Sequence, residues 1–203
     1  MMASKIIFVF SIITAAVADT SAESNFNEIP PNNHGTQPQI YIRGPIKPKR
    51  GELVTTIGRL STEWSLSLDI KILNPQTAIY TTFAQLSIGE NLVNHGDRTP
   101  LLHLRNDLGK IKLVICTSLN DDLNYIFTWE EPLTIGQRYH LEIKQRYVSG
   151  GNYRFFVLVN GVEIHSVANG KARQFYGVKF YLSSPWNEAS DVEIYDLKHT
   201  NFF

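Results

Sequence analysis

Apolar and polar residues alternate along most of the chain from Ile40 onward. The alternation is clearest between Trp64 and Ile72, where every second side chain is apolar and the intervening ones are Ser, Asp and Lys. A period of two places successive side chains on opposite faces of a strand, so this segment predicts an antiparallel strand with one buried and one wet face. Similar patterns predict strands at 80–88, 111–115, 124–129, 139–144, 178–182 and 192–194, and weaker runs occupy 40–43, 53–57 and 101–104.

The segment 153–167 predicts a β-hairpin, because two β-type runs meet at the Asn-Gly pair of residues 160 and 161. This pair tolerates the two positive φ values of a type I′ turn. The turn sets the register and predicts the cross-strand pairs Val159–Val162, Val157–Ile164 and Phe155–Ser166. That face is expected to lie in the core. We expect a second sheet to cover Phe156 and Leu158 on the other face, with an exposed apolar patch suited to a partner as the alternative.

These patterns amount to about twelve strands, separated by turn signals such as Asn74-Pro75 and Ser183-Ser184-Pro185. No window of the sequence shows the apolar stripe of a helix, and strands do not alternate with helical segments as parallel sheets require. Many short amphipathic strands of this kind predict an all-β fold, in which antiparallel strands form a two-sheet β-sandwich or jelly roll.

The first residues have the pattern of a targeting segment. Lys5 precedes an apolar run that is short for a membrane span, and Ala16-Val17-Ala18 has the small-x-small form of a cleavage site. We therefore expect a signal peptide at 1–18, a flexible N-terminal leader rich in Ser, Asn, Glu and Pro at 19–38, and a single β-sandwich domain at 39–203. The mature protein would be secreted and extracellular, with no membrane span.

Charge and cysteine content narrow the choice of partners. The chain has 19 basic and 19 acidic residues, so its net charge favours neither nucleic acid nor an anionic membrane as partner. Cys116 is the one cysteine of the sequence, which excludes an internal disulfide. Its place in a strand pattern predicts a small buried side chain, with an intermolecular disulfide or a reactive thiol as the alternatives.

Three segments carry a resemblance to a known superfamily: Trp64–Lys71, Pro132–Lys144 and Phe155–Gly161. A strand that follows a glycine turn and leads to a hairpin ending in Asn-Gly resembles the concanavalin A-like lectin/glucanase superfamily, which includes laminin-G-like, pentraxin-like and galectin-like sandwiches. The chain is also similar to a secreted animal domain of this superfamily, on the segments Gly96–Pro100, Glu163–Val167 and Val178–Trp186. The resemblance implies a sandwich fold and transfers no established activity.

Catalytic motifs are weak in this sequence. Asp191 and Glu193 share a strand face, but a glycosidase needs two carboxylates that face each other across a cleft, and a solvated outer face fits this pair better. No Gly-x-Ser-x-Gly elbow occurs, and the six histidines lack metal-ligand spacing. We therefore expect no enzyme activity and no cofactor, with Ca²⁺ left open although no clear motif supports it.

Candidate ligand-binding residues lie in two loops. The segment 94–100 gathers His95, Asp97 and Arg98 between a glycine and a proline, and loops on a rigid sandwich are common recognition sites. Asp97 could accept from sugar hydroxyls or bind Ca²⁺, Arg98 could clamp an anion, and Trp186 could stack on a sugar ring. The alternatives are structural: Asp97 caps its turn, Arg98 pairs with it, and Trp186 closes one end of the core.

These residues favour a lectin-like or extracellular-matrix-associated recognition module that binds a glycan or an extracellular glycoprotein through its loops. The first alternative is an extracellular structural or venom-type protein that acts by protein–protein contact. The second is a glycoside hydrolase of the glucanase branch.

Overall fold

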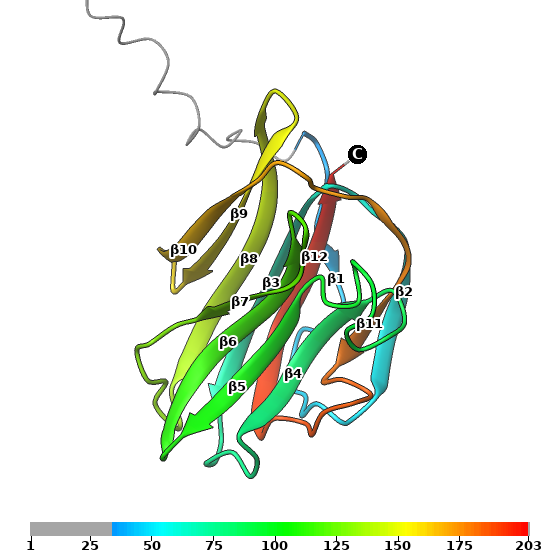
Figure 1. The fold of residues 1–203 in the computed structure, drawn as a ribbon. Coiled ribbons are helices and arrows are strands. Elements are labelled where there is room, and N and C mark those ends of the chain that lie inside the picture. The colour runs from blue at the N-terminus through cyan, green and yellow to red at the C-terminus, as the bar shows by residue number, and fades with distance from the viewer. Residues whose placement is uncertain (1–33, 203) are drawn as a thin grey trace, which may run out of the picture.

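The computed structural model describes residues 34–202, which fold into two six-stranded antiparallel sheets packed face to face (Figure 1). The first sheet has the strand order β1-β12-β3-β8-β9-β10 and the second sheet the order β2-β11-β4-β5-β6-β7. In that order, the strands of the first sheet span Gln39–Ile40, Val192–Phe202, Glu63–Ile72, Arg138–Ser149, Asn152–Val159 and Val162–Asn169. Those of the second sheet span Glu52–Leu60, Phe175–Leu182, Tyr80–Ser87, Leu101–Asp107, Lys110–Leu119 and Asp122–Thr128. The predicted antiparallel sandwich is confirmed.

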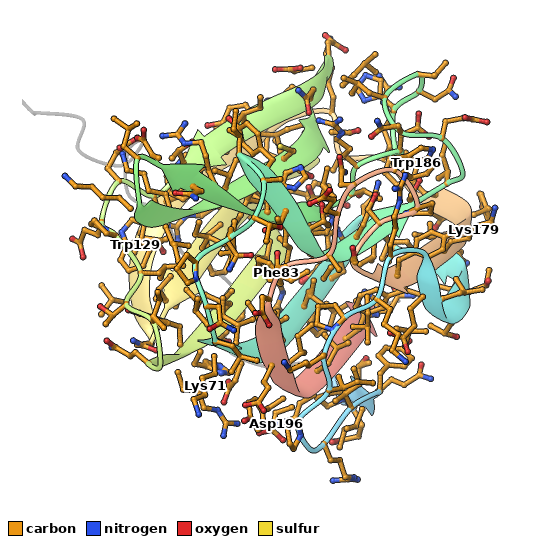
Figure 2. The ribbon with its side chains drawn as sticks, turned by 90° about the horizontal axis from the view of Figure 1, so that it is seen from below. Lys71, Phe83, Trp129, Lys179, Trp186 and Asp196 are labelled. Atoms are coloured by element: carbon orange, nitrogen blue, oxygen red, sulfur yellow. The ribbon has the colours of Figure 1, made fainter. Side chains whose placement is uncertain are left out.

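The core lies between the two sheets and follows the period-two pattern of the strands. Along β3, the alternate side chains from Trp64 to Ile72 are buried, and those between them are half-buried on the outer face. Phe83, Phe155 and Phe180 are fully buried, and Figure 2 shows Phe83 near the middle of the molecule. Because Cys116 is a free, buried thiol, apolar burial holds the two sheets together without a covalent link.

The hairpin β9–β10 contains a β-bulge that the sequence pattern did not predict. Val162 pairs with Val159 as expected, but the register then shifts between Glu163 and His165. The predicted pairs Val157–Ile164 and Phe155–Ser166 are therefore wrong: Val157 lies opposite His165, and Phe155 lies opposite Val167. One extra residue reverses which face the following side chains occupy. His165 consequently stacks on Phe127 of the other sheet, with ring centroids 4.1 Å apart.

The outer face of the first sheet is covered by charged side chains that pair with one another. Asp69 binds both Arg138 and His140, and Glu142 binds Lys144. Phe156 is buried on this same face, beneath the cations of Lys144 and Arg154. The expectation that a second sheet covers Phe156 is therefore wrong, because long basic side chains cover its ring instead.

The outer face of the second sheet is different, because an apolar patch lies at its centre. Leu101, Val114 and Cys116 form a small buried cluster that is separate from the main core. Leu101 pairs with Cys116 across the β5–β6 ladder. The patch lies on the opposite side of the sheet from the core, where it forms the floor of the hollow described below.

The loop at 183–191 completes the second sheet beside β4. Strand β11 ends at Leu182, and the backbone of the loop then pairs with Thr82, which donates to the carbonyl of Glu188 and accepts from the amide of Ser190. Arg50 fastens the loop by donating to the carbonyl oxygens of Pro185 and Trp186. The loop therefore lies at a fixed place along the edge of the outer face.

The predicted signal peptide, residues 1–18, and most of the predicted leader, residues 19–38, lie outside the described residues. These boundaries and the single domain at 39–203 stay predictions. Within residues 34–202, no helix has the length and apolar character needed to cross a membrane.

Stability should depend most strongly on the aromatic side chains of the inner faces. Phe180 is fully buried and packs edge-on against Tyr41, whereas Tyr176 on the same strand is 66% exposed. We predict that Phe180→Ala lowers the free energy of unfolding by about 3–5 kcal/mol, because it leaves a cavity. Tyr176→Ala should change it by less than about 0.5 kcal/mol. Urea unfolding followed by circular dichroism checks both values, and equal effects of the two substitutions would contradict the assignment of the core.

Candidate functional site

A groove of about 320 Å³ lies over the apolar patch on the outer face of the second sheet. Two larger hollows, of about 430 and 480 Å³, lie beside Arg59 and are lined mostly by polar side chains. The groove differs because it combines an apolar floor with an aromatic ring, an imidazole, a guanidinium and an amide. Its lining residues are Tyr80, Arg98, His103, Val114, Cys116, Ile126 and Asn187.

Arg98 is held in the groove by uncharged oxygens. Its Nε donates to the carbonyl oxygen of Asn91 at 3.1 Å, and its Nη2 donates to the side-chain oxygen of the same residue at 3.1 Å. Nη1 donates to Oδ1 of Asn124 at 2.5 Å. Within residues 34–202, no carboxylate forms an ion pair with Arg98. The guanidinium is thus fixed in direction while its charge is not neutralised by a protein group.

His103 presents a neutral imidazole beside Arg98. Its Nδ1 lies 2.9 Å from Oγ1 of Thr82 and 3.3 Å from the carbonyl oxygen of Thr81. A carbonyl only accepts, so the contact with Thr81 places the proton on Nδ1 and leaves Nε2 as the acceptor. Burial lowers the pKa of His103 to about 4; the hydrogen bond to Thr81 opposes this shift and the charge of Arg98 adds to it. The ring is therefore uncharged at neutral pH.

Tyr80 supplies an exposed aromatic ring at one end of the groove. The residue is 45% exposed, and its ring meets the His103 ring edge-on with centroids 5.7 Å apart. It pairs with Arg105 across the β4–β5 ladder. Its face is available to stack on a flat or partly apolar ligand.

Asp97 lies directly before Arg98 but has a structural environment. The residue is fully buried, and its carboxylate accepts hydrogen bonds from the backbone amides of Glu90, Val93 and Asn94. These bonds close the turn that carries Arg98 to the groove. The neighbouring Gly96 is required in this turn, because it has a φ of +96° and a Cβ there would lie 2.7 Å from the Phe175 ring.

The other two predicted residues lie outside the groove lining. His95 lines a separate small hollow together with Lys171 and Arg173. Trp186 is half-buried in the 183–191 loop, and the next residue, Asn187, is the one that lines the groove. The structure therefore brings Arg98 into the groove and does not bring His95, Asp97 and Trp186 together with it. Ligand binding by these four residues stays a prediction.

Tyr80, His103 and Asn187 are groove residues that sequence reasoning did not select. A usable signal existed for His103, because it stands between Leu102 and Leu104, two core positions of one strand, and must therefore face outward. Nothing local marks Tyr80 or Asn187, which reach the groove through the pairing of distant segments.

The carboxylates considered for catalysis have other partners. Asp191 accepts from the side-chain amide of Asn74 and pairs with Lys47, and Glu193 accepts from the Tyr195 hydroxyl. Within residues 34–202, no group of three or more His, Cys, Asp or Glu side chains is placed to hold a metal ion.

No protein-family model matches the chain, and no curated protein sequence matches it. Solved structures do resemble it. A heptameric SAP-like pentraxin from Limulus polyphemus aligns with a TM-score of 0.52 and 18% identity, over 79% of this chain and 74% of its own. An alginate lyase from Pseudomonas aeruginosa has a TM-score of 0.47 and 16% identity, over 68% of this chain and 64% of its own. An alginate lyase from Chlorella virus has a TM-score of 0.47 and 10% identity, over 70% of this chain and 72% of its own.

The similar structures bear on two predictions made from the sequence, namely the fold and the absence of enzyme activity. The pentraxin is a concanavalin A-like sandwich, and the chain has this same fold, as its resemblance implied. The prediction that the chain is not an enzyme is wrong as it stands, because many of the similar structures are alginate lyases. A concanavalin A-like fold therefore gives no ground for excluding catalysis.

Two buried histidines should make stability depend on pH. Burial lowers the pKa of both His103 and His199 to about 4, from 6.5 in an unfolded chain. Between these values the unfolded state binds more protons, so stability is fully present above pH 6.5 and falls as the pH drops toward 4. Between pH 7 and 5 we predict a loss of about 2 kcal/mol per histidine. Urea unfolding of wild type and His199→Gln at both pH values checks this, and parallel losses in the two proteins would refute the assignment.

Asp97→Ala should destabilise the fold, because it leaves three backbone amides without their acceptor. We predict a loss of about 2–4 kcal/mol in the free energy of unfolding. Asp97→Asn keeps one acceptor oxygen and should lose less. Thermal melting of the two variants measures the difference, and a wild-type melting temperature for Asp97→Ala would show that the turn does not depend on this carboxylate.

Proposed function

We propose that the protein is a secreted, lectin-like recognition module that binds a glycan or a glycoprotein through the groove on the second sheet. The observation that carries the proposal is the groove itself, whose lining combines the exposed ring of Tyr80 with apolar side chains and a few polar groups. Ligand sites of small molecules commonly combine an apolar surface with a few fixed polar groups.

The chemistry of the groove suits a sugar. A pyranose ring has apolar C–H faces that stack on aromatic side chains, and hydroxyl groups around its edge that donate and accept. Tyr80 offers the stacking surface, His103 offers an acceptor at Nε2, and Asn187 offers an amide that both donates and accepts. Each group belongs to a strand or to a loop fastened by backbone hydrogen bonds, so little ordering is needed on binding.

The outer face of the first sheet supports carbohydrate binding over a protein-contact role. Charged side chains on the outer face of the first sheet pair with each other, and Phe156 lies beneath them. That face offers no large apolar area among the described residues, which protein interfaces usually bury at their centre.

The test is binding to a glycan array, followed by titration calorimetry on the glycans retained. We predict that Tyr80→Ala weakens binding at least about tenfold, since removal of a stacking ring costs about 1.4 kcal/mol or more. Tyr176→Ala removes an exposed tyrosine on the same sheet and should leave the affinity unchanged. If wild type retains no glycan with or without Ca²⁺, or if Tyr80→Ala binds as tightly as wild type, the proposed site is wrong.

A second candidate function is cleavage of a bound acidic polysaccharide. The favouring observation is that His103 is a neutral base whose ring lies beside the phenol of Tyr80 and the guanidinium of Arg98. Nε2 would take the proton next to a sugar carboxylate, Arg98 would stabilise the negative charge that forms, and Tyr80 would protonate the leaving oxygen as the C–O bond breaks and a C=C bond forms. Ultraviolet absorbance of the unsaturated product measures this activity; its absence on acidic polysaccharides that bind would remove the candidate.

A further inference from the structure

We propose that the groove selects a sugar bearing a carboxylate or a sulfate, and that Arg98 binds this anionic group. The proposal rests on the proposed carbohydrate-binding function and narrows its ligand class. Its starting point is an imbalance of charge, because the groove contains a fixed cation for which the protein supplies no counter-charge.

The Arg98 guanidinium donates only some of its N–H groups to the protein. Arginine carries five N–H groups, and three of them are donated to the oxygens of Asn91 and Asn124. These acceptors are uncharged, so they orient the fork without cancelling its charge. Arg98 also interacts with the thiol of Cys116, which is only a weak acceptor. The N–H groups that are not donated to the asparagines belong to Nη1 and Nη2, the atoms with which an arginine commonly holds a carboxylate or a sulfate.

The charge of Arg98 acts on other residues of the groove. The positive charge of Arg98 reaches both His103 and the thiol of Cys116, where it opposes the effect of burial on the thiol pKa. Arg98 lines the groove together with both residues, so its charge acts within the groove. A half-buried cation above an apolar floor is weakly screened by solvent and attracts an anion more strongly than an exposed one does.

The carboxylates nearest in sequence or on the same face bind other groups of the protein. Asp97 turns away from the groove and binds three backbone amides. Further along this face, Asp107 contacts Arg105 and Lys112, and Glu130 contacts Lys112. Within residues 34–202, no carboxylate lies within ion-pair distance of the Arg98 guanidinium.

Arg105 is the next cation along β5 and forms an ion pair with Asp107. It lies two residues beyond His103 on the same face, a rise of about 7 Å. Its Nε is buried without a hydrogen-bond partner among the described residues.

The test compares sugars that differ only in charge. Titration calorimetry would use an oligouronate and the same oligosaccharide with its carboxylates reduced to alcohols, then a sulfated oligosaccharide and its desulfated form. We expect wild type to bind at least one charged member at least tenfold more tightly than its neutral partner. The first pair reports a carboxylate as the recognised group, and the second reports a sulfate. The preference should decrease as salt concentration rises.

Substitutions then assign the preference to Arg98. Arg98→Gln should remove the preference for the charged sugar while the weaker binding of the neutral sugar remains. Lys71→Gln is the matched control, because it removes one positive charge from the outer face of the first sheet, whereas the groove lies on the second sheet, and it should keep the preference. Arg98→Lys keeps the charge without the fork and should keep part of the preference.

The outcomes separate this proposal from the one on which it rests. Equal binding of charged and neutral sugars by wild type overturns the role of Arg98 and leaves carbohydrate binding standing. Binding of no sugar overturns carbohydrate binding itself. If Arg98→Gln fails to fold, as a lost melting transition would show, the wild-type comparison of charged with neutral sugars and its salt dependence still decide the matter.

Discussion

Apolar contact between the inner faces of the two sheets is the constraint on which the rest of the structure depends. Most strands contribute alternate side chains to this contact, and no disulfide supplements it. The same alternation leaves the other half of the side chains on the two outer faces, where packing does not dictate their identity. A sandwich of this kind therefore fixes a rigid backbone while the outer faces remain open to selection for function.

The fold could be predicted because the inner faces obey a strict period. Residues 64–72 show it fully, and the structure buries the alternate side chains that the sequence indicates. The bulge at Glu163 and His165 could not be predicted in this way. The position of an extra residue depends on how the two strands pair in the folded protein, where Phe155 lies opposite Val167.

The site was less predictable, for a related reason. Asp97 and Arg98 are neighbours in sequence, yet one closes a turn by binding backbone amides and the other reaches the groove. Sequence reasoning could find the loop but not divide these roles, because the partners of each side chain are fixed by the folded backbone. Tyr80, His103 and Asn187 come from β4, β5 and the 183–191 loop, and only strand pairing places them around one hollow.

Ion pairs occur on both outer faces, but Arg98 on the second sheet has no carboxylate partner among the described residues, and this difference supports the proposed anion site. On the first sheet, acidic and basic side chains form ion pairs with one another, so these charged groups need no ligand beyond water. On the second sheet, uncharged amide oxygens orient Arg98 beside a neutral imidazole and an apolar floor. A half-buried cation without a counter-ion costs free energy in the unbound protein. An anionic ligand offsets that cost, so the same feature that weakens the free fold favours the bound state.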